Sequence, residues 1–176
     1  MFFTTSRLQI IPLQQDDWPC FLQLHTDAQS MAFISDLPQH AEIRQRFLQR
    51  LQPWQVTSLH MLCFTLRLKT SQQPVGFVGI NAEWWPWRQA EVGYALQSEH
   101  FGHGYMAEAL APIVRGLFSD CQFHKLYASV VCGNLPSRRI LEQCDFQFER
   151  TRRQQVLLHG EWVDEWLFGC LLTDIQ

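Results

Sequence analysis

The segment from Ala90 to Leu110 constrains the fold more than any other, because it changes from a strand pattern to a helix pattern across two glycines. Apolar side chains alternate with other residues from 92 to 96, and from Met106 onward they recur every three or four residues. Gly102 and Gly104 lie between the two patterns. A strand that enters a helix through a glycine loop presents unpaired backbone N–H groups at the positive end of the helix dipole. The segment therefore predicts an anion site, of which a phosphate or a pyrophosphate is the commonest occupant.

The composition limits the classes of protein to which the chain can belong. Its 176 residues are 47% hydrophobic, which is enough for one domain with a sizeable core over residues 1–176. The formal net charge of -3 argues against a nucleic-acid binder that works through a broad basic surface. No apolar run approaches the roughly 20 residues of a membrane span, so we expect no membrane partner.

The cysteines and histidines indicate the redox compartment and the absence of a metal centre. The six cysteines are scattered and form no C-x-x-C pair, and the seven histidines do not group with them at ligand spacing. The opening residues, 1–7, lack the pattern of a signal peptide. We therefore expect reduced, mostly buried thiols in a cytoplasmic protein, and no metal site.

Alternation, helical spacing and turn residues divide the rest of the chain into further elements. Pro12 closes the first strand, on what should be an edge of the sheet, and Asp16 or Asp17 is expected to cap the first helix. The expected strands are residues 7–13, 60–68, 75–81, 90–97, 125–131, 148–158 and 161–171, and the expected helices end near Thr26, run over 41–51, begin near Tyr105, and run from Asn134 to about Gln143. This order predicts a single mixed α+β sheet with helices packed on it.

Two common phosphate-binding loops do not fit the glycine segment. The chain contains no G-x-x-x-x-G-K-[ST] motif, which excludes a P-loop. A Rossmann site requires strands joined by helices, whereas the strands before this loop are joined by tight hairpins. Ala107 stands where the third glycine would be, and the acidic residue about 20 positions on would be Asp120, at the end of a helix.

Five motifs in order across the chain fit a third type of loop. They are Thr5–Leu8, Phe101–Ala109 (Phe-Gly-His-Gly-Tyr-Met-Ala-Glu-Ala), Asn134–Ser137 (Asn-Leu-Pro-Ser), Cys144–Phe146 and Gly160–Asp164. The chain resembles the GNAT acetyltransferase superfamily and, more narrowly, the branch that contains the ribosomal-protein alanine and serine N-terminal acetyltransferases. Members of that branch typically show Trp-Gly-Lys-Gly-Tyr-x-x-Glu-Ala, Asn-x-x-Ser and Leu-Gly-Phe segments.

Three positions depart from the pattern of that branch. Phe101 replaces the usual Trp, Gln or Arg, Asp145 replaces the glycine of Gly-Phe, and Pro112 lies inside the long helix. Pro112 is expected to kink that helix, because proline lacks the N–H of an interior helical hydrogen bond. None of the three departures removes an amide that a pyrophosphate would need.

The resemblance implies a particular fold and a particular co-substrate. It implies a mixed, mostly antiparallel sheet with helices on both faces, in which the parallel strands 90–97 and 125–131 splay apart. Acetyl-CoA would bind in the gap, with its pantetheine arm paired to the exposed strand edge and its pyrophosphate on the loop amides. The residues expected to contact it are Tyr94, Ala95, Leu96, Phe101, Gly102, His103, Gly104, Tyr105, Met106, Ala107, Asn134 and Ser137.

The resemblance also implies direct attack of an amine on the thioester, which needs a base and an acid. Glu91 is the candidate base, and the alternative is a solvated carboxylate opposite the buried face of its strand. Ser137 is the candidate acid, with Asn134 holding the pantetheine. The alternative for this pair is structural, because Asn134 is a good N-cap and Ser137 occupies the N3 position of the same helix. For Glu108, stabilisation of its own helix dipole is the expected role.

The identity of the acetyl acceptor is the feature that the sequence determines least. It would be a primary amine on a protein N-terminus, for example a ribosomal one, or on a polyamine or antibiotic. Alternatives are a catalytically silent acyl-CoA-binding module and a nucleotide-phosphate binder of another class. The Trp84–Trp87 cluster could line the acceptor site, form a homodimer contact or cover the sheet, and Arg138 and Arg139 could meet the CoA 3′-phosphate. A cationic amine could be attracted by the acidic residues Glu83, Glu161, Asp164 and Glu165. An acidic partner could instead be attracted by the basic residues Arg150, Arg152 and Arg153.

Overall fold

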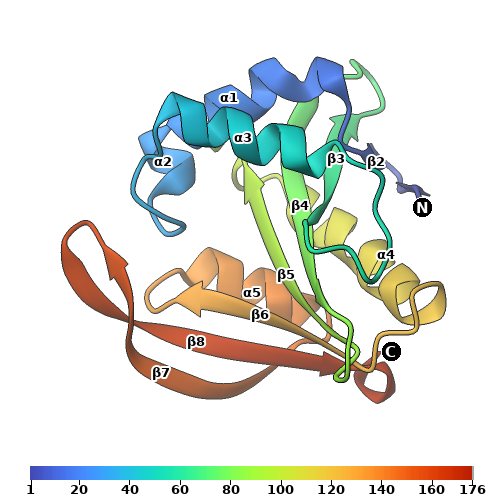
Figure 1. Ribbon diagram of the computed structural model, residues 1–176, viewed down its shortest axis with the longest axis vertical. Helices are drawn as coiled ribbons and strands as arrows, with labels where there is room; N and C mark the ends of the chain where they lie inside the picture. Colours follow the sequence, from blue (N-terminus) through green and yellow to red (C-terminus); the bar gives the residue numbers. More distant parts are fainter. Residues whose placement is uncertain (176) are drawn as a thin grey trace.

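One mixed sheet forms the centre of the computed structural model, which describes residues 1–175 (Figure 1). Its strands are β1 (Phe3–Thr4), β2 (Leu8–Pro12), β3 (Leu62–Leu68), β4 (Pro74–Glu83), β5 (Gln89–Leu96), β6 (Lys125–Val131), β7 (Gln147–Leu158) and β8 (Glu161–Leu171). They lie in the order β1-β2-β3-β4-β5-β6-β8-β7. Neighbouring strands are antiparallel except β5 and β6, which are parallel. The predicted mixed, mostly antiparallel sheet is confirmed.

Helices cover both faces of this sheet. They are α1 (Trp18–Thr26), α2 (Ala28–Met31), α3 (His40–Arg50), α4 (Tyr105–Ser119) and α5 (Leu135–Gln143), with 3-10 turns η1 (Gln15–Asp17), η2 (Ser98–His100) and η3 (Leu172–Asp174). Phe21 of α1 and Phe47 of α3 pack on Phe77 of β4, whereas the next residue, Val78, belongs to the core that contains Leu110 of α4. Successive strand residues point to opposite faces, so α1 and α3 lie on one face and α4 on the other. In residues 1–175, no helix has the length and apolar character needed to cross a membrane.

The sequence patterns located the longer elements to within a few residues but missed the shortest ones. β1 has two residues and α2 has four, so neither displays a full period of the kind that the patterns detect. β1 pairs only with Gln9 and Ile10 of β2. Pro12 therefore lies beyond β1, at the open side of β2, as an edge proline should. Helix α4 continues through Pro112 to Ser119.

Asp17 directly precedes α1, but its carboxylate does not cap that helix. It accepts hydrogen bonds from the Thr65 hydroxyl at 2.7 Å and from the Gln14 N–H at 2.8 Å, and it forms a buried ion pair with Arg67. The capping prediction is thus wrong for Asp17, because two partners on β3, nearly 50 residues away, engage its side chain. This contact fastens the start of α1 to the sheet.

The two parallel strands separate soon after they begin. β5 and β6 pair through Gln89–Lys125, Ala90–Leu126 and Glu91–Tyr127 only, although both strands continue well beyond these residues. β5 remains paired with β4 up to Leu96, and β6 remains paired with β8 up to Val131. Figure 1 shows the two strands adjacent at the lower right and diverging toward the upper left. The predicted splay is confirmed, and it begins at Glu91.

Candidate active site

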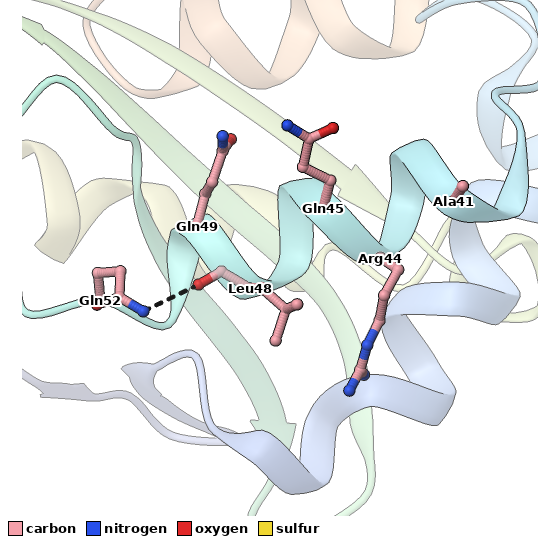
Figure 2. Close-up of a pocket in the computed structure, with 6 residues that line it drawn as sticks. All are labelled: Ala41, Arg44, Gln45, Leu48, Gln49 and Gln52. Carbon is pink, nitrogen blue, oxygen red and sulfur yellow. Dashed lines mark hydrogen bonds between the residues drawn. The ribbon is translucent and has the colours of Figure 1, made fainter.

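A hollow on the outer side of α3 contains none of the predicted site residues (Figure 2). Its volume is about 440 Å³, and it is lined by Ala41, Arg44, Gln45, Leu48, Gln49 and Gln52. All six come from one helix and the residues just after it, so the hollow is a surface groove and not a cleft between elements. The chemistry of the sequence motifs lies elsewhere, at the splay and at the start of α4.

The strand edge exposed by the splay is the first part of the candidate site. Beyond Glu91, the side of β5 that faces β6 makes no ladder hydrogen bonds to β6 among residues 1–175. Tyr94, Ala95 and Leu96 lie on this stretch and are partly buried. An unpaired strand edge can bind an extended, amide-bearing chain as an added strand. The predicted pantetheine-binding residues are thus in a position that suits this role.

The glycine loop leads from β5 into the N-terminus of α4. Gly102 and Gly104 have φ of 78° and 74°, in the left-handed region that favours glycine. The first backbone hydrogen bond of the helix runs from the Glu108 N–H to the Gly104 carbonyl at 3.1 Å. The three N–H groups of the preceding turn, 105–107, therefore have no partner inside the helix. Gly104, the N-cap residue, offers no side chain to cap them, so this helix start has the N–H donors that the predicted anion site would use.

The side chains of the loop divide between the core and the surface. Met106 is buried in the core, whereas Phe101 and His103 are exposed. The His103 ring stacks on Tyr105 with a centroid separation of 5.4 Å and an interplanar angle of 7°. A Cβ added to Gly102 would meet nothing within 4 Å, so this glycine borders open space.

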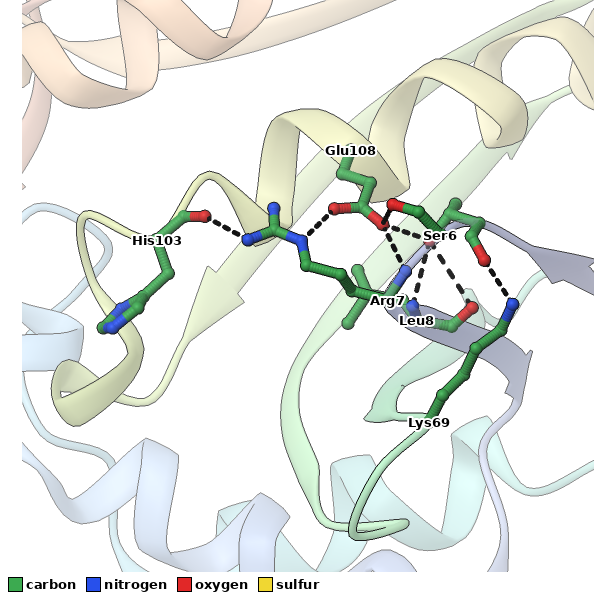
Figure 3. A network of polar contacts seen from close by, with 7 residues as sticks. Ser6, Arg7, Leu8, Lys69, His103 and Glu108 are labelled. Atoms are coloured by element: carbon green, nitrogen blue, oxygen red, sulfur yellow. Dashed lines mark hydrogen bonds and ion pairs between the residues drawn. The ribbon is translucent and has the colours of Figure 1, made fainter.

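An N-terminal strap holds the start of α4 through Glu108 (Figure 3). The Glu108 carboxylate accepts hydrogen bonds from Thr5, from the Ser6 hydroxyl at 3.0 Å and from the Arg7 N–H at 2.9 Å, and it pairs with Arg7 Nε at 2.6 Å. Arg7 also donates to the His103 carbonyl at 3.0 Å. Burial alone would raise the pKa of Glu108, but these hydrogen bonds lower it to about 2. Glu108 thus does more than stabilise its helix dipole, because it ties residues 5–7 to the glycine loop.

Glu91 occupies the last paired position before the strands diverge. Its side chain is half-buried on the face opposite Val92, which rules out a fully solvated carboxylate. Burial raises its pKa above the ordinary value, and a hydrogen bond from Ser129 and the nearby Arg152 partly offset the rise. A carboxylate whose pKa is raised toward neutrality is better suited to accept a proton than a solvated one.

Ser137 and Tyr94 meet on the other side of the sheet. The Tyr94 hydroxyl lies 2.9 Å from Ser137 Oγ, and it donates to the Ser137 carbonyl at 3.1 Å. Burial raises the pKa of Tyr94 well above its usual range, so the phenol stays protonated. Asn134 caps α5, since its Oδ1 accepts from the Ser137 N–H at 3.2 Å. The structural role expected for Asn134 is present, and the Ser137 hydroxyl is left within a hydrogen-bonded pair.

Several residues that we considered from the sequence as contacts for a ligand or a partner instead form ion pairs or ring contacts with other residues of the protein. Arg138 pairs with Glu142 at 2.8 Å and lies over the Trp166 ring at 5.3 Å. Arg152 pairs with Glu165, so these two groups compensate each other. Glu142 lies one turn away on the same helix, whereas Trp166 and Glu165 lie on β8, so only the tertiary fold brings these last two to their arginines.

The tryptophans at the tip of the β4–β5 hairpin divide into two kinds. Trp84 packs edge-on against Phe123 at 5.6 Å and belongs to the core, as expected of aromatic cover. Trp85 and Trp87 are 87% and 64% exposed. The tip precedes β5, whereas the glycine loop follows β5, so the two exposed rings lie at the opposite end of the strand from the phosphate site.

Comparison with known proteins identifies this arrangement. The family model for the acetyltransferase (GNAT) domain matches residues 7–147. The chain belongs to the GNAT acetyltransferase family. The probable N-acetyltransferase YjcK of Bacillus subtilis (strain 168) is 35% identical over 85 residues, which are 48% of this chain and 47% of that protein. The match with this relative therefore spans about half of its length.

Two solved GNAT structures share the fold of the whole chain. The ribosomal-protein-S5-alanine acetyltransferase from Vibrio fischeri is 20% identical, with a TM-score of 0.80 over 100% of this chain and 99% of that one. Spermidine N-acetyltransferase from Vibrio cholerae, solved in complex with CoA and spermine, is 18% identical, with a TM-score of 0.84 over 96% and 98% of the two chains. At these identities the likeness concerns the fold, and it includes the strands that position the candidate site.

Proposed function

We propose that the protein transfers an acetyl group from acetyl-CoA to a primary amine. One observation carries the proposal: β5, which separates from β6 after Glu91, leads into a glycine loop whose first helix amides have no partner inside the helix. The splay provides an unpaired strand edge for an amide-bearing arm, and the loop provides N–H donors for a pyrophosphate. CoA carries both in one molecule, because its pyrophosphate is joined to one end of the amide-bearing pantetheine arm and its thiol lies at the other end.

The residues present fit this co-substrate, which supplies an acetyl group activated as a thioester. The amides from Gly102 to Ala107 would hold the pyrophosphate, and Tyr94 to Leu96 would hold the pantetheine. Asn134 uses one lone pair of its Oδ1 to cap α5, so its NH2 group and the second lone pair would be the contacts for the arm. The charge of the loop is not required to be positive, because the amides and the helix dipole supply the field.

In the proposed reaction, Glu91 carries out one proton transfer and Ser137 carries out the other. Glu91 takes a proton from the amine as its nitrogen forms a bond to the acetyl carbon. Ser137, paired with Tyr94, gives a proton to the CoA sulfur as the carbon–sulfur bond breaks. A backbone N–H between Tyr94 and Leu96 would stabilise the charge that develops on the thioester oxygen. Glu91 and Tyr94 face opposite sides of β5, so the proposal requires the thioester to lie in the gap between the diverging strands, where groups from both faces can approach it.

The acceptor enters, on this proposal, from the face that carries Glu91. That side is bordered by α2 and by the tip of the β7–β8 hairpin, where the His159 N–H donates to Asp36 at 2.9 Å. A hollow of about 300 Å³ lies between them. The names of the Vibrio proteins suggest two kinds of acceptor, a protein N-terminal amine and a polyamine. We propose a protein N-terminus as the first candidate and a small polyamine as the second.

Two measurements test the proposed function. Thermal shift should show stabilisation by acetyl-CoA and by CoA, and little effect of ATP or NAD; stabilisation by a nucleotide alone would contradict the site assignment. Acetyl transfer should then be followed by mass spectrometry with N-terminal peptides and polyamines. Mass detection is preferable to thiol reagents, because the protein contains six free cysteines of its own. Tight binding without transfer to any amine would identify a silent acyl-CoA-binding module.

A further inference from the structure

A single side chain bridges the glycine loop and the helix that follows it. Arg7 Nε donates to Glu108 Oε2 on α4 at 2.6 Å, and Nη1 of the same guanidinium donates to the His103 carbonyl of the loop at 3.0 Å. Figure 3 shows the guanidinium between these two groups. Because a guanidinium is planar and holds its N–H groups in fixed directions, the two hydrogen bonds fix the loop carbonyl relative to the helix.

The backbone of Arg7 is itself held by its surroundings. Its carbonyl accepts a hydrogen bond from the Lys69 N–H at 2.9 Å, and its N–H donates to Glu108 Oε1 at 2.9 Å. The next residue, Leu8, is fully buried and begins β2, where it pairs with Leu68 of β3. The guanidinium therefore extends from a base that is anchored in the sheet.

The loop needs support from outside, because packing holds little of it. Residues 101–104 are all exposed, and the first buried side chain after them is that of Met106. The Arg7 guanidinium also lies over the ring of Tyr105, with its central carbon 4.6 Å from the ring centroid. Arg7 thus contacts the loop at the two residues on either side of Gly104.

Glu108 does not depend on the guanidinium for its hydrogen bonds. Its carboxylate also accepts from the hydroxyls of Thr5 and Ser6 and from the Arg7 N–H. A different side chain at position 7 would leave these three donors in place. What the guanidinium adds is the hydrogen bond to the His103 carbonyl, so its particular contribution concerns the loop.

The contact with the His103 carbonyl also determines where the next N–H points. The peptide between His103 and Gly104 is trans, so its carbonyl and its N–H point in opposite directions. With the carbonyl held by Arg7, the Gly104 N–H is directed away from the guanidinium. Among residues 1–175 this N–H has no hydrogen-bond partner, and it directly precedes the three unpaired N–H groups at the start of α4. Without the guanidinium this peptide could rotate, because glycine is conformationally permissive.

We infer that Arg7 is a positioning residue for the CoA pyrophosphate, because it holds the His103–Gly104 peptide with its N–H directed at the ligand. This inference rests on the proposed function, which takes the loop amides as the pyrophosphate site. Arg7 acts through the backbone and does not itself touch the co-substrate. Its charge is paired with that of Glu108, so the pair attracts an anion only weakly, and the contribution of Arg7 is the direction of one backbone donor.

The first test is isothermal titration calorimetry with CoA. Arg7→Gln should raise the Kd by about 5-fold to 30-fold, because a hydrogen bond to a charged group is weakened. Arg7→Lys, a milder change that keeps the charge but not the planar fork, should also bind more weakly than wild type. Arg88→Gln is the matched control and should keep the wild-type Kd. Arg88 Nε likewise donates to a backbone carbonyl, that of Gln122 at 3.0 Å, but it directly precedes β5 and lies at the end of the strand away from the loop. A wild-type Kd in either Arg7 variant, or an equal rise in Arg88→Gln, would overturn the inference.

A second readout needs no ligand. In protein labelled with nitrogen-15 glycine, NMR relaxation of the Gly104 amide, assigned from Gly104→Ala, reports whether its peptide is held. In wild type and in Arg88→Gln this amide should be as rigid as that of Gly116 within α4, and in Arg7→Gln it should gain motion or conformational exchange. Weaker CoA binding with unchanged relaxation in folded Arg7→Gln would assign Arg7 a direct contact with the ligand and refute the positioning role. Failure of wild-type protein to bind CoA would contradict the proposed function, whereas a Kd that wild type and Arg7→Gln share would contradict only the role of Arg7.

Discussion

Replacement of Gly104 by valine separates the function of the loop from its conformation. Gly104 has φ of 74°, and the nearest atom to an added Cβ is Arg7 Nη2 at 3.7 Å, an ordinary contact. The protein therefore has room for a Cβ at this position, and two effects of valine follow. A left-handed conformation costs a β-branched residue about 1–2 kcal/mol, and the side chain would project over the amides at the start of α4.

The loss of stability and the loss of affinity can be estimated and measured separately. In a chain of this length, a loss of 1–2 kcal/mol lowers Tm by about 2–8 °C. A hydrogen bond to a charged group contributes about 1.5–3 kcal/mol, so loss of one or two pyrophosphate contacts should weaken acetyl-CoA binding by at least about 10-fold. Isothermal titration calorimetry measures the Kd, and thermal unfolding measures the Tm of the same sample.

Gly160→Val provides the matched control. Gly160 has φ of 80° in the β7–β8 turn, and an added Cβ there would meet nothing within 4 Å, so it too meets no steric obstacle. It should lower Tm to a similar extent and leave the Kd for acetyl-CoA unchanged. Wild-type affinity in folded Gly104→Val would refute the assignment of the loop, and an equal loss of affinity in both variants would show that binding responds to general destabilisation.

Four other substitutions have defined outcomes. The folded-state pKa of Glu108, about 2, lies below its ordinary value of 4.5, so its contacts stabilise the fold above pH 4.5 and lose that effect as the pH falls toward 2. Urea unfolding should show Glu108→Gln about 1–3 kcal/mol less stable than wild type at pH 7, with a smaller difference at pH 3; an equal difference at both would contradict the strap. Asp145 has φ of 66° after α5, so Asp145→Gly should gain about 0.5–1 kcal/mol, measured as a rise in Tm. Glu91→Gln should lower kcat by about 100-fold or more with little change in the Kd for acetyl-CoA. Ser137→Ala should lower kcat less than Glu91→Gln does, because the Tyr94 hydroxyl remains beside the position of the lost Ser137 hydroxyl. Full activity in Ser137→Ala would refute the role of Ser137 as the general acid.

Patterns confined to neighbouring residues were sufficient for most of the fold. The alternation around Val92 and the spacing from Met106 onward located β5 and α4, and two glycines located the loop between them. The aligned glycine position at Asp145 is left-handed in the structure, which explains why the family favours glycine there. The splay of β5 and β6 could be predicted only from the family resemblance, because no property of either strand alone specifies where their pairing ends.

Contacts between distant residues could not be predicted in the same way. Asp17 looked like a helix cap until Thr65 and Arg67 were placed beside it. Ser129 gave no signal as a partner of Arg152, since the two lie on strands separated by a helix in the sequence.

Acetyl transfer itself is the most direct test of the account. Purified protein, isotopically labelled acetyl-CoA and a panel of N-terminal peptides and polyamines should yield an acceptor that carries the labelled acetyl group on its amine, together with an equal amount of free CoA. Glu91→Gln, which should bind acetyl-CoA normally, should yield far less of both. Labelled acceptor formed equally well by Glu91→Gln, or none formed by wild-type protein saturated with acetyl-CoA, would contradict the proposed site.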